Sequence, residues 1–268
     1  MPDDYGNANP DWLEIDWRQH LHHVALPGAE VNYAEIGEGE PIVFIHGISG
    51  SWQNWLENLP HFGRSHRAIA LDLPGFGEIG VERGAALVGN PMGGLVAGEA
   101  VLSAPERFDR LVFVSAAGLI NTWLPHQRGK ATSHAWRTFG PHYRRAADAI
   151  VRNRLLRYLT FRFAIRYPGR LRRELLWEQL ANGVPCEGFA DALDAVLEYD
   201  ARDRLEEIEI PTMIVWGFED WVISALAALS YHRRIPHSRL EIFERTGHVP
   251  QLERPARFNR LLDDFLAG

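Results

Sequence analysis

Residues Gly89, Asn90, Pro91, Met92 and Gly93 have the spacing of a G-x-S-x-G turn, and we call them the elbow turn. In such a turn, a serine between a buried strand and a helix presents its hydroxyl as a nucleophile. The context fits, because an apolar run precedes the turn and a helix-like stretch follows it. Here proline stands at the serine position. Proline has no nucleophilic atom, and its ring fixes φ near about −65°, so it cannot adopt a strained elbow geometry.

Three other serines are candidates for a substitute nucleophile. Ser115 ends an apolar run at 110–115, and we interpret it as structural, as a serine that ends a strand usually is. Ser49 and Ser51 lie in the glycine-containing turn after the apolar run at 41–45. They have a slightly stronger claim than Ser115, because they would line the same pocket as the elbow turn.

Short apolar runs predict the strands that would position the elbow turn. A continuous apolar run is the pattern of a strand buried in a parallel sheet. Such runs occur at 41–45, 67–72, 86–89, 110–115 and 211–217, and residues 240–243 alternate into a last strand. Residues 20–25 and 29–35 alternate around Pro27-Gly28, which predicts a hairpin. Helices are expected after Ser51, across 121–200 and from Arg254 onward.

The composition limits the class of protein. A chain of 268 residues with 46% apolar residues is long enough for one large α/β domain with an insertion. Its single cysteine, Cys186, excludes an intramolecular disulfide and a Cys-rich metal site, and we expect no cofactor. We find neither a signal peptide nor a membrane span, so we predict a cytoplasmic protein. Residues 1–17 are polar and are expected to form an arm with little structure of its own.

Basic residues are concentrated in one part of this acidic chain. Residues 121–185 contain 13 Lys and Arg against 3 Asp and Glu, although the whole chain has a net charge of −7. We favour a solvated outer face as the explanation. The alternatives are that these basic residues attract an anionic substrate or an acidic membrane surface. No nucleic-acid-binding motif accompanies the charge, so we do not expect a nucleic-acid partner.

Several ordered motifs together resemble the α/β-hydrolase superfamily. They are HGISGSWQNW at 46–55, DLPGFG at 72–77, ALVGNPMGG at 86–94 and RFNRLL at 257–262. Within that superfamily, the chain is similar to serine hydrolases that include carboxylic-ester and meta-cleavage carbon–carbon bond hydrolases. The resemblance covers nearly all of the chain after about Val24. It implies an α/β-hydrolase fold, with a core at 1–120 and 201–268 and a helical lid at 121–200.

The resemblance also implies roles for individual residues. His248 matches the general base of the family and Asp220 the acid that orients it, with Glu219 as a weaker rival for the acid. Pro91 takes the nucleophile position and is not competent. The backbone N–H groups of Ile48 and Met92 would form the oxyanion hole. The remaining histidines are expected on the surface or in packing.

The turn after the strand at 41–45 would line the pocket for a small-molecule substrate or ligand. Its residues are His46, Gly47, Ser49 and Trp52. In the family, the lid supplies further apolar walls. Ala146, Ile150, Val151, Leu155, Leu159 and Phe163 form an apolar stripe there, opposite Arg145, Arg152, Arg154 and Arg157. We favour packing of this stripe onto the core over contact with a membrane.

The connection before the elbow strand is shorter than in the family. Only nine residues, 76–84, remain where the family has a loop and a full helix. Nine residues can span roughly 30 Å, which permits the crossover but leaves one face of the sheet without its helix.

Three functional interpretations follow. The chain is a hydrolase by resemblance, strongly impaired by Pro91. Alternatively it is a non-catalytic binding protein for a small molecule, or an enzyme in which His248 and Asp220 transfer protons without covalent catalysis.

Overall fold

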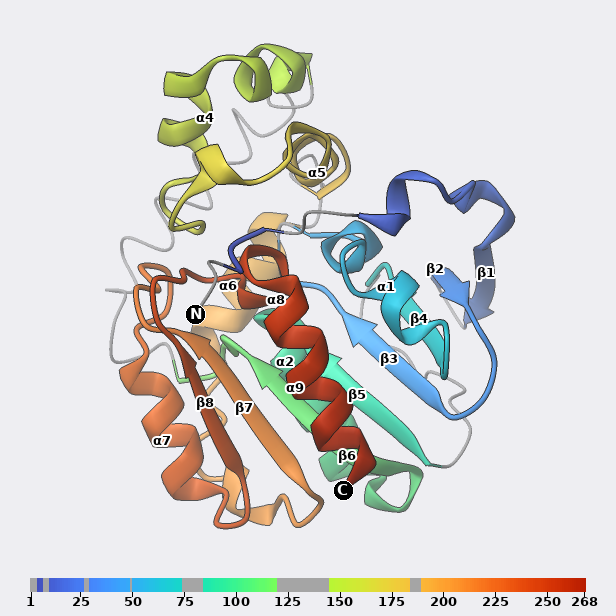
Figure 1. Ribbon diagram of the computed structural model, residues 1–268. Coiled ribbons are helices and arrows are strands. Elements are labelled where there is room, and N and C mark those ends of the chain that lie inside the picture. Colours follow the sequence, from blue (N-terminus) through green and yellow to red (C-terminus); the bar gives the residue numbers. More distant parts are fainter. Residues whose placement is uncertain are drawn as a thin grey trace.

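An eight-stranded sheet runs through the centre of the protein (Figure 1). The computed structural model describes residues 4–6, 10–26, 29–48, 50–73, 84–119, 145–183 and 189–268. The strands lie in the order β1-β2-β4-β3-β5-β6-β7-β8. Their bounds are β1 (Leu21–Leu26), β2 (Ala29–Ile36), β3 (Pro41–Ile45), β4 (Arg67–Leu71), β5 (Ala85–Gly89), β6 (Phe108–Val114), β7 (Thr212–Gly217) and β8 (Arg239–Phe243).

The strands from β3 onward pair in parallel, whereas β1 and β2 join the sheet antiparallel. The predicted hairpin and the predicted mostly parallel α/β sheet are therefore confirmed. In the register, Ile45 pairs with Gly89, and Gly217 pairs with Phe243. The segments that follow these residues consequently emerge at one edge of the sheet, where open α/β sheets bind ligands.

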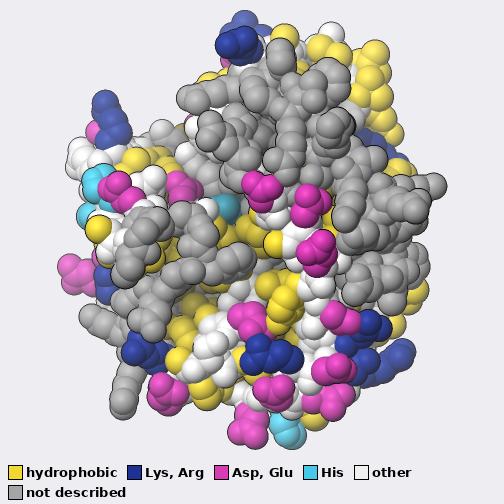
Figure 2. Space-filling model, turned by 180° about the vertical axis from the view of Figure 1, so that it is seen from behind, with side chains coloured by type: hydrophobic (Ala, Val, Ile, Leu, Met, Phe, Trp, Pro, Cys, Tyr) yellow, Lys and Arg dark blue, Asp and Glu magenta, His cyan; other side chains and the backbone are white. Residues whose placement is uncertain are grey.

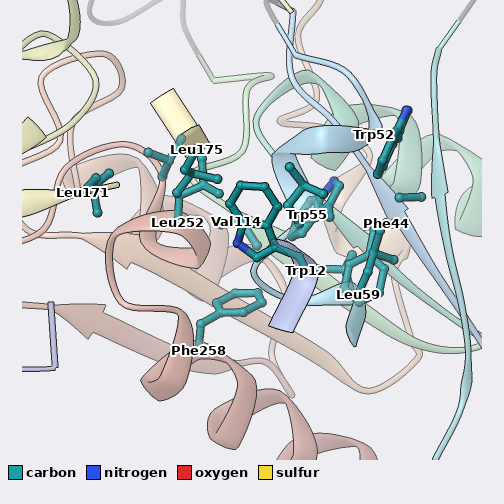
Figure 3. Packing of buried hydrophobic residues seen from close by; sticks show 14 of the residues in the cluster. Trp12, Phe44, Trp52, Trp55, Leu59, Val114, Leu171, Leu175, Leu252 and Phe258 are labelled. Atoms are coloured by element: carbon teal, nitrogen blue, oxygen red, sulfur yellow. The ribbon is translucent and has the colours of Figure 1, made fainter. Parts of the chain in front are cut away.

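Helices cover both faces of the sheet, because successive side chains of a buried strand point to opposite faces. Ile42 and Phe44 of β3 belong to one core cluster, and Val43 and Ile45 belong to the other. The first cluster includes Phe258 and other side chains shown in Figure 3. It is covered by α1 (Leu59–Phe62), α8 (Pro250–Glu253) and α9 (Pro255–Ala267). The second is covered by α2 (Met92–Ser103), α6 (Phe189–Glu198) and α7 (Leu226–Arg234).

Short helical turns complete the described elements. The 3-10 turns are η1 (Asp11–Leu13), η2 (Trp17–Gln19), η3 (Trp52–Trp55), η4 (Pro105–Arg107), η6 (Pro168–Arg170) and η8 (Leu205–Glu207), and η7 (Gln179–Gly183) is a π turn. The helix expected after Ser51 is thus divided between η3 and α1. Among its described residues, the N-terminal arm contains η1 and the start of η2, and Tyr5 and Trp12 are buried in the core.

Residues 145–183, which we call the cap segment, lie above the carboxyl edge of the sheet in Figure 1. They contain helical residues 145–152, α4 (Arg154–Phe161) and α5 (Arg173–Glu178). Residues 120–144, which begin the predicted lid, lie outside the described part of the chain. The domain boundaries therefore remain a prediction.

The predicted apolar stripe of the cap segment is only half buried. Ile150 is buried, but Leu155 and Leu159 are each 64% exposed, and Arg157 is buried instead. The reason is a helix break at Asn153, whose side chain caps α4 by accepting hydrogen bonds from two backbone amides of its first turn. Because the helix is interrupted there, residues before and after Asn153 no longer share one helical face, and the predicted stripe is divided. The expectation that the whole stripe packs onto the core is wrong for its second half.

The shortened connection predicted at 76–84 falls almost entirely within 74–83, which lie outside the described residues. Within the described ranges, we find no helix with the length and apolar character needed to cross a bilayer.

Candidate active site

His248 and Asp220 lie side by side at the carboxyl edge of the sheet. Asp220 follows β7 and His248 follows β8, so the pairing of two neighbouring strands brings them together. Nδ1 of His248 is 2.8 Å from Oδ2 of Asp220, and both residues are only 6% exposed. An imidazole whose Nδ1–H donates to a carboxylate carries its lone pair on Nε2. Nε2 is therefore the atom that can accept a proton.

Backbone amides fix the orientation of the Asp220 carboxylate. Its Oδ1 accepts hydrogen bonds from the N–H of Val222 at 2.8 Å and from that of Ile223 at 2.9 Å. Its other oxygen is then left to accept from the imidazole. This arrangement holds the acid in the position that an orienting carboxylate needs.

We call residues 244–249, the segment that carries the imidazole, the histidine turn. Three of its backbone N–H groups donate hydrogen bonds to other segments. Glu219 accepts a hydrogen bond of 2.9 Å from the N–H two residues before the histidine. The N–H of Gly247 donates to Oε1 of Glu253 at 2.8 Å. The N–H of His248 donates to the carbonyl of Ala164 in the cap segment at 2.7 Å. Glu219, the weaker rival for the acid, thus supports this turn.

Glu253 connects the histidine turn to two other segments. Its Oε2 accepts hydrogen bonds from the hydroxyl of Tyr5 at 2.6 Å and from the N–H of Arg166 at 2.8 Å. Burial raises the pKa of Glu253 to about 7, although the hydrogen bonds favour its charged form. We did not predict either Tyr5 or Glu253 from the sequence. The available signal was the presence of aromatic residues, Tyr5, Trp12 and Trp17, in an arm without other signs of structure.

Pro91 lies directly after β5, at the N-cap position of α2. Its φ of −74° and ψ of −39° are in the right-handed helical region, which proline adopts without strain. Its carbonyl accepts a hydrogen bond of 2.9 Å from the N–H of Ala117. The elbow turn is therefore relaxed where a nucleophile elbow is strained.

Asn90 joins the elbow turn to the histidine turn. Its Nδ2 donates to the carbonyl of Val114 at 2.8 Å and to that of His248 at 3.3 Å. Its Oδ1 accepts a hydrogen bond from Gln251 at 3.1 Å. The residue before Pro91 thus contacts the backbone of the histidine. A common catalytic site for Pro91, Asp220 and His248 stays a prediction.

The ring of Pro91 packs against the turn after β3. A Cβ atom added to Gly47 would lie 2.1 Å from Cδ of Pro91 and 3.0 Å from the carbonyl oxygen of Asn90. Ile48 follows this contact, and Met92 begins α2, whose first-turn N–H groups have no acceptor within the helix. The role of Ile48 and Met92 as oxyanion donors remains a prediction.

The predicted pocket residues lie beside this contact. His46 donates from Nδ1 to the carbonyl of Gly47 at 2.6 Å and accepts at Nε2 from the N–H of Leu73 at 2.9 Å. Burial lowers the pKa of His46, which fits this neutral tautomer. Trp52 is buried as well, and Ser49 lies outside the described residues. Their contribution to a substrate pocket stays a prediction.

The other serines have structural surroundings. Ser115 is fully buried and has a φ of +45°. A hydroxyl without access to solvent cannot meet an incoming substrate, so burial supports the structural interpretation of Ser115. Ser51 caps η3 in a reciprocal arrangement with Asn54.

A cavity of about 260 Å³ lies elsewhere, among residues of η1, α1 and α9 and their neighbours. Trp12, Glu57, His61 and Arg260 are among the residues that line it. None of the predicted site residues lines this cavity. It therefore does not mark the acid–base pair.

Known proteins resemble the chain both in sequence and in structure. A 2-hydroxy-6-oxo-2,4-heptadienoate hydrolase of Pseudomonas putida is 31% identical over 274 residues, which cover 91% of this chain and 95% of that protein. A 2-hydroxymuconate semialdehyde hydrolase of a Pseudomonas species is 29% identical, covering 91% of this chain and 93% of its own length. The solved structure of Est816, described as an N-acyl homoserine lactone degrading enzyme, matches with a TM-score of 0.71 and 27% identity, covering 91% of this chain and all of that chain.

The model of one protein family, described as the alpha/beta hydrolase fold, matches residues 78–255. This match spans the elbow turn, the cap segment and both members of the acid–base pair. Together with the sheet order and the relatives, it shows that the chain belongs to the α/β-hydrolase fold family.

Proposed function

We propose that this protein derives from hydrolases of carboxylic esters or carbon–carbon bonds, and that its covalent step is strongly impaired. The observation that carries the proposal is the position of Pro91, which follows β5 at the start of α2. The side chain of the preceding Asn90 contacts the carbonyl of His248, the buried partner of Asp220. In an intact site, a serine at this position gives its proton to Nε2 of the histidine and attacks the carbonyl carbon. Proline has neither the proton nor the oxygen for this step.

The expected loss is large, because the members of a catalytic triad act as a unit. Removing the nucleophile leaves only the roughly 10³ to 10⁴-fold acceleration that binding and the oxyanion hole provide over water. We therefore expect hydrolysis of short p-nitrophenyl esters to stay near background in the natural chain.

Labelling with a fluorophosphonate tests this proposal, because the probe reports a nucleophilic serine directly. We expect no labelling of the natural chain, and labelling at the new serine in Pro91→Ser. We expect only weak recovery of ester turnover, because the sequence predicts that the shortened connection at 76–84 lacks the helix that the family has there.

The matched control is Pro91→Ser combined with His248→Ala, which keeps the new hydroxyl and removes its base. This double variant should lose the labelling. Stoichiometric labelling of any serine in the natural chain would contradict the proposal, since it would identify a substitute nucleophile.

A second candidate function is proton transfer without covalent catalysis. Its support is the tautomer of His248, whose Nδ1 bonds to Asp220 and whose Nε2 can act as a base. The names of the relatives describe 2-hydroxydienoate substrates, which are enols with a carboxylate group. We infer that a small anionic enol of this kind suits the site, because proton transfer between oxygen and carbon needs a base and no nucleophile.

Deuterium exchange tests this second function. In D₂O, the chain should accelerate deuterium incorporation into the carbon skeleton of 2-hydroxy-6-oxo-2,4-heptadienoate, as followed by NMR. His248→Ala should abolish the acceleration, whereas Pro91→Ala should retain it. Equal exchange with and without the protein would exclude this function.

A further inference from the structure

Helix α4 exposes a set of large apolar side chains to solvent. Leu155 and Leu159 are each 64% exposed, Phe163 just beyond the helix is 58% exposed, and Leu156 and Tyr158 are more than two-fifths exposed. We call these five residues the α4 patch. Large apolar side chains that gather on one surface usually mark an interaction site.

The buried face of α4 includes an arginine as well as an aromatic side chain. Arg157 is only 6% exposed, and Phe161, one turn later, is 8% exposed. Burial and the neighbouring charges of Arg173 and Arg154 lower the pKa of the Arg157 side chain. A helix that packs only against its own core places leucines inward and arginines outward. Arg157 departs from this pattern, because it is buried while Leu155 and Leu159 stay 64% exposed. We take this departure as support for a partner on the outer face of α4.

The surroundings of the α4 patch are strongly basic. Residues 145–173 contain nine arginines and one carboxylate, Asp148, in a chain whose net charge is −7. Arg145, Arg152 and Arg154 are exposed. Figure 2 shows hydrophobic and basic side chains together along the upper edge of the molecule, where the cap segment lies. The partner must therefore offer both apolar and anionic groups.

Charge complementarity selects among the partners. A second copy of this chain bound through the same face would place arginines against arginines, which opposes association. An anionic bilayer offers acyl chains to the leucines and phosphate groups to the arginines. We propose that the α4 patch and its arginines dock this protein peripherally onto an anionic lipid surface.

The docking surface adjoins the acid–base pair. The guanidinium carbon of Arg162, next to the α4 patch, lies 3.5 Å from the centre of the ring of Trp221. Trp221 is 56% exposed and directly follows Asp220 in the chain. The loop that orients the catalytic-type histidine thus lies at the border of the proposed lipid-facing surface.

Sedimentation of the full chain with vesicles tests the proposal. We expect binding to phosphatidylcholine vesicles that contain phosphatidylglycerol, and at least about tenfold weaker binding to phosphatidylcholine alone. Leu155→Ser with Leu159→Ser should weaken binding about tenfold or more, because buried leucines drive interfacial insertion. Arg152→Gln with Arg154→Gln should weaken it about tenfold and reduce its sensitivity to salt.

The matched control is Leu13→Ser with Leu21→Ser, which replaces two exposed leucines outside the cap segment and should leave binding unchanged. Thermal unfolding of every variant establishes that it is folded. A second measurement detects insertion directly. An environment-sensitive dye is attached to Leu159→Cys in a Cys186→Ser background, and its emission should shift to the blue with anionic vesicles only.

Three results would overturn the proposal. They are failure to bind either type of vesicle, equal binding to both types, and a dimer in solution that the two α4 serine substitutions abolish while vesicle binding is absent. The last result would assign the α4 patch to a second copy of the chain.

Discussion

The two halves of the candidate site differ in completeness. The acid–base half has its imidazole, its carboxylate and the contacts that orient both, including Val222, Ile223 and Glu253. The nucleophile half has its strand, its glycines and its helix, but Pro91 leaves it without a reactive atom. The difference shows that the scaffold of a site and its reactive atom are separate properties. Here a strand, a turn and a helix fold without a hydroxyl at the position where a nucleophile elbow carries one.

Both halves contain a glycine at which an added Cβ atom would clash with a neighbouring segment. In the acid–base half, a Cβ atom on Gly217 would lie 1.9 Å from the carbonyl oxygen of Gly247. In the nucleophile half, a Cβ atom on Gly47 would lie 2.1 Å from the side chain of Pro91. At Gly217 the added Cβ would meet backbone atoms, so the clash is removed only if the backbone moves. At Gly47 the nearest atom belongs to the side chain of Pro91, which can be replaced by substitution.

The largest expected effect therefore comes from Gly217→Ala. We expect it to lower the free energy of unfolding by more than about 3 kcal/mol, because the histidine turn would have to move away from β7. Denaturant unfolding measures this loss. The control is Gly169→Ala in the cap segment, where an added Cβ meets nothing within 4 Å and should change stability by less than about 0.5 kcal/mol. Equal stability of the two variants would contradict the close contact.

The next effect is a pH dependence that belongs to the acid–base half. Glu253 has a pKa of about 7 in the folded state, above its ordinary 4.5, so the folded protein binds this proton more tightly than the unfolded chain does. Its protonation stabilises the fold fully below about pH 4.5, and this contribution is lost as the pH rises through 7. The loss amounts to about 3 kcal/mol for a shift of this size.

Comparison with Glu253→Gln isolates this contribution, because glutamine has nearly the same shape and does not titrate. The stability of the natural chain relative to Glu253→Gln should decrease between pH 4.5 and 7 and stay level above that range. Tyr5→Phe removes a donor to the charged carboxylate, so it should move the decrease to higher pH. Parallel stability curves for the natural chain and Glu253→Gln would refute the buried titration.

The smallest effect concerns the nucleophile half. Gly47→Ala should lower the free energy of unfolding by about 2 kcal/mol, because its Cβ would press on the Pro91 ring. The same substitution in a Pro91→Ala background should cost less, since the clashing Cδ is absent. A double-mutant cycle measures this coupling. Strictly additive effects would show that the Pro91 ring does not restrict the turn after β3.

The sequence predicted the sheet well and parts of the surroundings poorly. The apolar runs identified the strands because burial in a sheet constrains every residue of a short segment. The face on which a helical residue lies is harder to predict, because a single break in the helix changes it for every later residue. The stripe predicted through the cap segment ended at Asn153, where one polar side chain caps a new helix and exposes Leu155 and Leu159.

The same distinction applies to the site. The order of Pro91, Asp220 and His248 along the chain predicted a shared site by resemblance, and the structure places these residues at one edge of the sheet. No motif in the sequence predicted the contacts of Glu253 with Tyr5 and Arg166, because Tyr5 and Glu253 are 248 positions apart.

By itself, the sequence determined where the strands lie along the chain and the absence of a hydroxyl at residue 91, since apolar periodicity and side-chain chemistry are local properties. Only the tertiary structure decided which buried carboxyl supports the histidine turn and which leucines remain in solvent. Those outcomes depend on contacts between segments that are distant in the sequence, and a local pattern of residues does not predict such contacts.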